Sequence, residues 1–143
     1  MASSRLDDGA DNGNAAPMLN LARNALGKVL LFADRVTSPT SLTRDPAAQA
    51  KVNAACQDLV LYDLEGCPFC IKVRREMKRL ALPIARRDIG KNAVFKQELM
   101  AGGGTYQAPC LRITEGARTN GGATRWMYES DEINAYLKSR FSP

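Results

Sequence analysis

The stretch from Leu59 to Leu80 constrains the fold of this chain more than any other. It opens with a short apolar run, Leu59-Val60-Leu61-Tyr62, which suits a buried strand. A turn at Gly66-Cys67-Pro68 follows, and from Phe69 onward apolar side chains recur at helical spacing. Because a strand, a helix and a second strand form a right-handed crossover, we expect the next strand to pair with this one in parallel. The sequence therefore predicts an α/β domain that begins at Leu59.

The rest of the chain continues this alternation. The patterns predict a strand at 84–89, a helix at 92–101, strands at 109–113 and 125–128, and a last helix from Ser130 or Asp131, as N-cap, to about Phe141. Gly102-Gly103-Gly104 ends the middle helix, and the polar, Gly-rich segment 114–124 predicts a hairpin loop. The order β-α-β-α-β-β-α over residues 59–143 predicts a mixed four-stranded sheet with helices on both faces.

The residues ahead of this domain are predicted to form a tail and a helical extension. Residues 1–17 are polar and rich in turn-forming residues, which predicts a disordered tail. Residues 18–58 carry two helical patterns, the first at 18–36 and the second at 46–56 with Asp45 as its N-cap. We therefore divide the chain into a tail, a helical extension and the α/β domain at 59–143.

The chain contains four cysteines and no histidine, and this combination narrows its chemistry. Without histidine, no Ser-His or Cys-His nucleophile pair and no imidazole metal ligand can form. A reactive thiol in this chain must then be activated by a helix N-terminus, by nearby cations or by a second thiol.

The motif Cys67-Pro68-Phe69-Cys70 lies where the first predicted strand gives way to a helix. A free thiol with a pKa near 8.5 is only about 3% thiolate at pH 7, and the unpaired N–H groups of a helix N-terminus favour the anion. Pro68 suits the first helical position, where its missing N–H has no partner to lose. We expect Cys67 to be the nucleophile and Cys70, one turn further into the helix, to be the more buried resolving thiol.

A zinc site is the main alternative for this motif. Cys-x-x-Cys supplies only two of the four ligands of a structural zinc site, and the remaining cysteines, Cys56 and Cys110, are single and far apart. We therefore predict no metal site. Cys56 and Cys110 are interpreted as small apolar packing residues, although Cys110, next to Pro109, is also a candidate redox sensor.

Charge and hydropathy limit the partners and the location of the protein. The longest apolar run, Val29 to Ala33, has five residues, whereas a membrane span needs about 20. The N-terminus lacks the apolar segment of a signal peptide. A net charge of +5 is too small to indicate nucleic-acid binding. We expect a reduced, cytoplasmic protein that binds neither membrane nor nucleic acid.

Three segments together resemble the glutaredoxin family. Residues 61–70, with Cys67-Pro68-Phe69-Cys70, resemble its strand and active-site turn, and Gln107-Ala108-Pro109 resembles its cis-proline loop. Residues 127–133 are similar to the Glu-Ser turn of glutathione-transferase N-terminal domains and of the bacterial glutaredoxins built like them. The resemblance covers residues 59–143. It implies a thioredoxin-like fold and glutathione as co-substrate.

The resemblance also implies how glutathione is held. Ala108 would offer its backbone to the cysteinyl group beside a cis Pro109, while Glu129 pairs with the γ-glutamyl ammonium and Ser130 with the helix N-terminus receives the α-carboxylate. The implied glutathione-binding residues are Phe69, Gln107, Ala108, Pro109, Glu129 and Ser130.

One departure from the family concerns the glycine carboxylate of glutathione. Many glutaredoxins carry a Lys just before the active-site turn, where this chain has Asp63 and Glu65. The carboxylate is therefore expected to find Lys72 or Arg74, or to be held weakly.

The leading hypothesis for function is an enzyme, a monomer or weak dimer. It would use glutathione to reduce protein or small-molecule disulfides and glutathione mixed disulfides through Cys67. One alternative is a carrier of a [2Fe–2S] cluster, ligated by Cys67 and bound glutathione of two protomers. Another is a non-catalytic module that docks a partner through residues 18–58.

Overall fold

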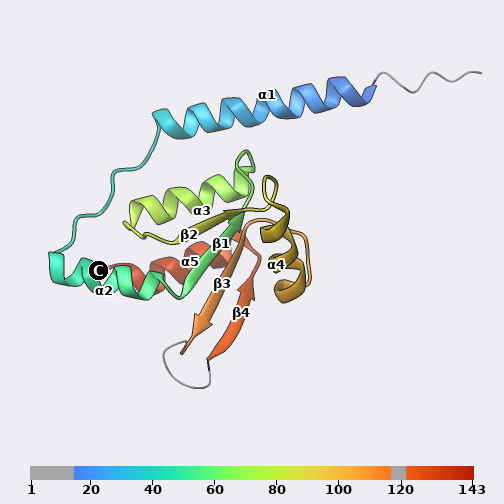
Figure 1. Cartoon of the computed structure of the whole chain (residues 1–143). Coiled ribbons are helices and arrows are strands. Elements are labelled where there is room, and N and C mark those ends of the chain that lie inside the picture. Colours follow the sequence, from blue (N-terminus) through green and yellow to red (C-terminus); the bar gives the residue numbers. More distant parts are fainter. Residues whose placement is uncertain (1–14, 117–121) are drawn as a thin grey trace, which may run out of the picture.

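The structure is a computed structural model that describes residues 15–116 and 122–143 (Figure 1). Most of the predicted tail, and residues 117–121 of the predicted hairpin loop, lie outside the described residues. The elements, in chain order, are α1 (Ala15–Val36), α2 (Pro46–Cys56), β1 (Leu59–Asp63), α3 (Pro68–Arg79), β2 (Ala85–Asp88), α4 (Ala93–Gly103), β3 (Cys110–Glu115), β4 (Ala123–Met127) and α5 (Ser130–Phe141). Every element predicted from the sequence is present, with its ends shifted by a few residues.

The four strands form one sheet in the order β2-β1-β3-β4. β1 pairs in parallel with β2 and antiparallel with β3, and β3 pairs antiparallel with β4. All five residues of β1 are buried, because the strand lies inside the sheet and is covered on both faces. This explains why its sequence is a continuous apolar run rather than an alternation.

Two apolar cores lie on the two faces of the sheet. On one face, α3 and α5 pack against β1 and β3, with Leu80 and Ile133 among the fully buried side chains. On the other face, α4 packs on Tyr62 and Cys110 through Leu99. A mixed four-stranded sheet with this order, covered by helices on both faces, is the predicted thioredoxin-like fold (Figure 1).

The glycine run at the end of α4 differs from the prediction. Gly102 and Gly103 lie inside the helix, and only Gly104, with φ of 81°, takes the left-handed conformation that ends it. The first two glycines are required by close packing instead. A Cβ on Gly102 would come 2.1 Å from the Trp126 ring, and one on Gly103 would come 2.1 Å from the Tyr128 hydroxyl.

The helix caps also differ in part from the prediction. The N-cap of α5 is Glu129, so Ser130 is the first residue inside the helix rather than its cap. Asp45 is the N-cap of α2 as predicted, with Pro46 at the first position, but its side chain makes no capping hydrogen bond.

Helix α1, ahead of β1, is attached to the domain by hydrogen bonds and an ion pair. α1 starts at Ala15, inside the predicted tail, and runs along α3 (Figure 1). Arg75 of α3 donates to Asp34 at 3.0 Å and to the carbonyl of Thr37 at 2.7 Å, which anchors the end of α1. None of the helices in the described part of the chain is long and apolar enough to cross a membrane.

The side chain of Arg44, in the segment before α2, bonds to two helices of the domain. Arg44 donates to the carbonyl oxygens of Leu80, at 2.5 Å, and Phe141, at 2.7 Å, so it joins the ends of α3 and α5. Cys56, at the end of α2, is buried in the core beneath these two helices. The extension is therefore packed on the domain, and both side-chain hydrogen bonds and apolar contacts hold it there.

Candidate active site

Cys67 lies at the junction of β1 and α3, where it is the N-cap of the helix. Its backbone is extended, with φ of −75° and ψ of 124°, and its carbonyl oxygen accepts the first helical hydrogen bond from the N–H of Ile71 at 2.9 Å. Pro68 follows at the first helical position. The Cys67 side chain is half-buried, so a substrate can reach the sulfur, and it makes no capping hydrogen bond to the first turn of the helix.

Cys70 lies one turn further along α3 and is fully buried. Burial raises the pKa of the Cys70 thiol to about 12, against the opposing hydrogen bond that the N–H of Leu64 donates to its sulfur at 3.4 Å. The neighbouring Cys67 raises this pKa further. The predicted difference in burial between the two thiols is confirmed, whereas their roles as nucleophile and resolving thiol stay predictions.

The other two cysteines are buried apart from this pair. Burial raises the pKa of Cys56 to about 11 and that of Cys110 to about 11, the latter despite a hydrogen bond with Tyr128. Both sulfurs pack in the apolar cores. Within residues 15–116 and 122–143, no group of three or more His, Cys, Asp and Glu side chains could hold a metal ion.

The loop before β3 lies beside the active-site turn, at the end of the sheet where β1 finishes and β3 begins. Tyr62 of β1 pairs with Cys110 of β3 in antiparallel register, so the residues before Cys110 lie beside those after Tyr62. The Ala108–Pro109 peptide bond is cis, which confirms the conformation implied by the resemblance. Pro109 is buried, Ala108 is half-buried and Gln107 is exposed.

The start of α5 lies beside the first turns of α3. Lys72 of α3 and Asp131 of α5 form an ion pair, and the two helices pack along their length. The ion pair joins the start of α5, with the exposed N-cap Glu129 and the buried Ser130, to the part of α3 that follows Cys70. Phe69, which follows Pro68, is 61% exposed, so its ring is open to a ligand.

The two cations expected to receive the glycine carboxylate are already paired. Lys72 is bonded to Asp131. Arg74 donates to the fully buried carboxylate of Asp63 at 2.9 Å and to the carbonyl oxygens of Leu64, at 3.2 Å, and Glu65, at 2.7 Å. Arg74 therefore holds the active-site turn in place, a role that sequence reasoning missed.

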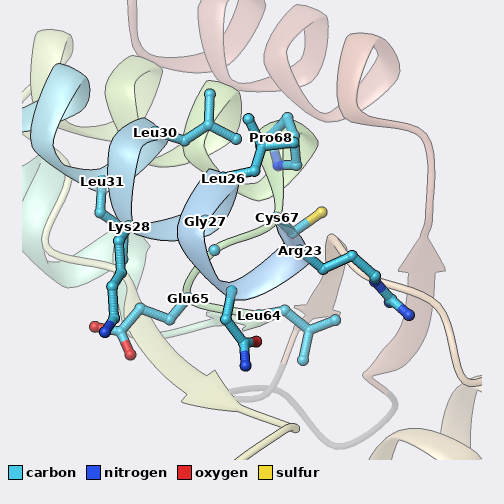
Figure 2. Close-up of a pocket in the computed structure, with 12 residues that line it drawn as sticks. Arg23, Leu26, Gly27, Lys28, Leu30, Leu31, Leu64, Glu65, Cys67 and Pro68 are labelled. Atoms are coloured by element: carbon cyan, nitrogen blue, oxygen red, sulfur yellow. The ribbon is translucent and has the colours of Figure 1, made fainter. Parts of the chain in front are cut away.

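A cleft of about 990 Å³ lies between α1 and the active-site turn (Figure 2). Its walls are residues from these two segments: Arg23, Asn24, Leu26, Gly27, Lys28, Leu30, Leu31, Leu64, Glu65, Gly66, Cys67 and Pro68. The sequence predicted the helices of the extension but not their position at this cleft, because nothing in the pattern of residues 18–58 indicates what they pack against.

Comparison with known families matches the part of the chain that carries β1, β2 and β3. Residues 59–116 match the glutaredoxin family model. The match supports a glutaredoxin domain that begins at β1, includes both thiols and the cis-proline loop, and ends after β3. No curated protein and no solved structure matches the chain. The glutaredoxin domain indicates thiol–disulfide oxidoreductase activity, while α1, α2, β4 and α5 lie beyond the matched residues.

Proposed function

We propose that the chain is a glutathione-dependent thiol–disulfide oxidoreductase that reduces disulfides and glutathione mixed disulfides through Cys67. The observation that carries this proposal is the unequal pair of thiols on α3. Cys67 is half-buried at the helix N-terminus, and Cys70 is fully buried with a pKa raised to about 12. One sulfur is accessible to substrate, and burial of the other disfavours its thiolate form.

The proposed reaction with a glutathione mixed disulfide uses Cys67 alone. The Cys67 thiolate attacks the glutathione sulfur, the Cys67–glutathione bond forms, and the substrate leaves as a thiolate that takes up a proton. The thiolate of a second glutathione then attacks the bound glutathione sulfur, which releases oxidised glutathione and restores the Cys67 thiolate. The substrate sulfur is thereby reduced to a thiol, and the second glutathione is oxidised as it joins the first in glutathione disulfide.

A protein disulfide brings Cys70 into the reaction. After Cys67 has formed a mixed disulfide with the substrate, Cys70 must lose its proton and attack the Cys67 sulfur, which closes the Cys67–Cys70 disulfide and frees the substrate thiol. Burial disfavours the Cys70 thiolate, so this step needs a deprotonation that the route through glutathione does not. We therefore propose that the route through Cys67 and glutathione carries most of the turnover.

The proposed glutathione site combines the segments around these thiols. The Ala108 backbone, beside the cis Pro109, would pair with the cysteinyl group, and the exposed Phe69 ring would pack on the peptide. Glu129 and Ser130, at the start of α5, would receive the ammonium and the carboxylate of the γ-glutamyl end. Gln107, exposed in the same loop, is the remaining contact that we propose.

The test is glutathione-coupled turnover of a small mixed disulfide by the wild type, Cys67→Ser and Cys70→Ser. We expect Cys67→Ser to abolish turnover and Cys70→Ser to retain it, because the reaction of a mixed disulfide needs one thiol. Equal loss in both variants would refute the assigned roles. No turnover by correctly folded wild type would refute the function, and a brown colour with charge-transfer absorption would then favour the cluster carrier.

A further inference from the structure

Helix α1 forms one wall of the cleft that contains Cys67. The helix approaches the active-site turn closely through two glycines, since a Cβ on Gly66 would come 3.4 Å from the Cα of Gly27. Figure 2 shows α1 crossing the turn, with the Cys67 sulfur at the edge of the cleft. The helix lies outside the residues that match the glutaredoxin family. This chain therefore has a cleft wall beside Cys67 that the matched residues do not provide.

Three charged side chains line the cleft. Glu65, on the turn, forms a hydrogen-bonded ion pair with Lys91. The hydrogen bond from Lys91 lowers the pKa of the Glu65 carboxyl. Arg23 and Lys28, on α1, make no ion pair within the part of the chain that the structure describes. In Figure 2 the side chains of Arg23 and Cys67 extend to the same side of α1, while Lys28 extends to the opposite side, as Glu65 does.

The other cations around the turn have partners already. Arg74 and Arg86 are bonded to Asp63, and Lys72 is bonded to Asp131. An anionic ligand that reaches Cys67 could bind one of these cations only after its ion pair had been broken. Arg23 can bind such a ligand without that cost.

We propose that Arg23 binds a carboxylate of the substrate whose sulfur reacts at Cys67. This inference rests on the proposed function, under which the carboxylate is that of the glycine residue of glutathione. The γ-glutamyl end is assigned to Glu129 and Ser130, at the start of α5, which leaves the glycine carboxylate in need of a cation. A guanidinium group suits this role, because its planar donors match the two oxygens of a carboxylate.

The cleft has the size and lining that such a ligand needs. Its volume of about 990 Å³ is at the upper end of small-molecule sites, about 300–1,000 Å³. Apolar side chains from both walls, Leu26, Leu30 and Pro68, line the same cleft. Arg23 is exposed, so salt should weaken its contribution.

The experiment compares two substrates that differ only in this carboxylate. One is the mixed disulfide of glutathione with a neutral reporter thiol, and the other is the same compound with the glycine carboxylate as its ethyl ester. For Arg23→Gln we expect kcat/KM to fall about threefold to tenfold with the acid and to stay unchanged with the ester. Arg23→Lys, which keeps the charge but loses the planar donors, should recover part of the loss.

Arg35→Gln is the matched control. It removes the same charge from an exposed position of the same helix, about 18 Å further along. We expect it to leave kcat/KM unchanged with both substrates. If it lowered kcat/KM for the acid as much as Arg23→Gln does, the effect would belong to the overall charge of α1, and the proposal would be wrong.

Two further outcomes would overturn the proposal. An Arg23→Gln variant with wild-type kcat/KM for the acid shows that Arg23 does not bind it, and equal losses with acid and ester show that Arg23 acts on Cys67 or on folding. In both cases wild-type turnover leaves the proposed function intact. If the folded wild type turned over neither substrate, the proposed function would fail and this inference with it.

Discussion

The guanidinium of Arg74 donates a 2.9 Å hydrogen bond to the fully buried carboxylate of Asp63, which joins α3 to the end of β1. The same guanidinium donates to the carbonyl oxygens of Leu64 and Glu65. A buried carboxylate is tolerated only when it is paired and hydrogen-bonded, and Arg86 supplies a second hydrogen bond at 2.9 Å. The turn that leads to Cys67 is therefore held by this ion pair and its hydrogen bonds, in addition to the packing of Leu64 on the core.

Removing Arg74 should destabilise the protein. In Arg74→Met the Asp63 carboxylate stays buried with Arg86 as its remaining partner, and the turn carbonyls lose their donor. We expect the free energy of unfolding to fall by about 3 kcal/mol, as for other broken buried pairs. Urea unfolding at pH 7, followed by circular dichroism, measures this change.

Arg79→Met is the control for that measurement. Arg79 lies on the same helix and pairs with Glu76, three residues before it, with its side chain exposed. An exposed pair of this kind contributes little to stability, because water screens the two charges. Equal losses in the two variants would contradict the assignment of a special role to the Asp63–Arg74 pair.

The reaction of Cys70 should depend steeply on pH. In the reduced protein, burial raises the pKa of Cys70 to about 12, and this burial remains when Cys67 is in a mixed disulfide. Well below its pKa, the thiolate fraction of Cys70 grows about tenfold per pH unit. With Cys67 prepared as a mixed disulfide with glutathione, we expect the rate of glutathione release by Cys70 to rise about tenfold per unit from pH 7 to pH 10. Single-turnover kinetics in the absence of other thiols measure this rate.

Cys70→Ser provides the baseline for this experiment, since it should release no glutathione at any of these pH values. A wild-type rate that levels off near pH 9 would mean that Cys70 ionises near its ordinary value. Burial would then not control the second step.

Sequence reasoning succeeded where the determinants are local. The apolar run at Leu59 and the helical spacing after Phe69 depend on neighbours in the chain, and both elements occur as predicted. The same is true of the cis bond before Pro109, which the resemblance implied through a short motif. Patterns of this kind define the sheet, the helices and the segments that surround the thiols.

The remaining features arise from contacts between distant segments, which no local pattern reveals. Gly27 meets Gly66 because α1 crosses the active-site turn, and nothing in residues 18–36 indicates this partner. Arg74 was expected to be available to a ligand, but its partner is the buried Asp63. Gly102 resembles a helix stop in sequence, and only the position of Trp126 shows why a larger residue does not fit.

That packing predicts a specific effect of Gly102→Ala. In an exposed helix the change would be stabilising by about 0.5–1 kcal/mol, because alanine is the better helix former. Here the new methyl group would lie 2.1 Å from the Trp126 ring, so α4 or the ring must move. We expect a net loss of about 1–3 kcal/mol in the free energy of unfolding. Adding Gly102→Ala to Trp126→Leu should remove most of that penalty, and an equal loss in both backgrounds would contradict the proposed clash.

Alkaline pH should destabilise the protein in part through Cys56, which is buried beneath α3 and α5. Burial raises its pKa from an ordinary value of 9.0 to about 11. Between these values the unfolded chain has lost the thiol proton while the folded chain retains it, so the free energy of unfolding falls as pH rises. Over this window the contribution of Cys56 should fall by about 2–3 kcal/mol.

Cys56→Ala isolates that contribution. The variant starts from a lower stability at pH 7 because it loses packing in the core, but its free energy of unfolding should fall less steeply between pH 9 and pH 11 than that of the wild type. The titrations of other groups are common to both proteins and cancel in the difference. Urea unfolding at several pH values under reducing conditions measures the two slopes. Parallel slopes would show that the Cys56 thiol ionises at the same pH in the folded and unfolded chains, and that its burial does not control its charge.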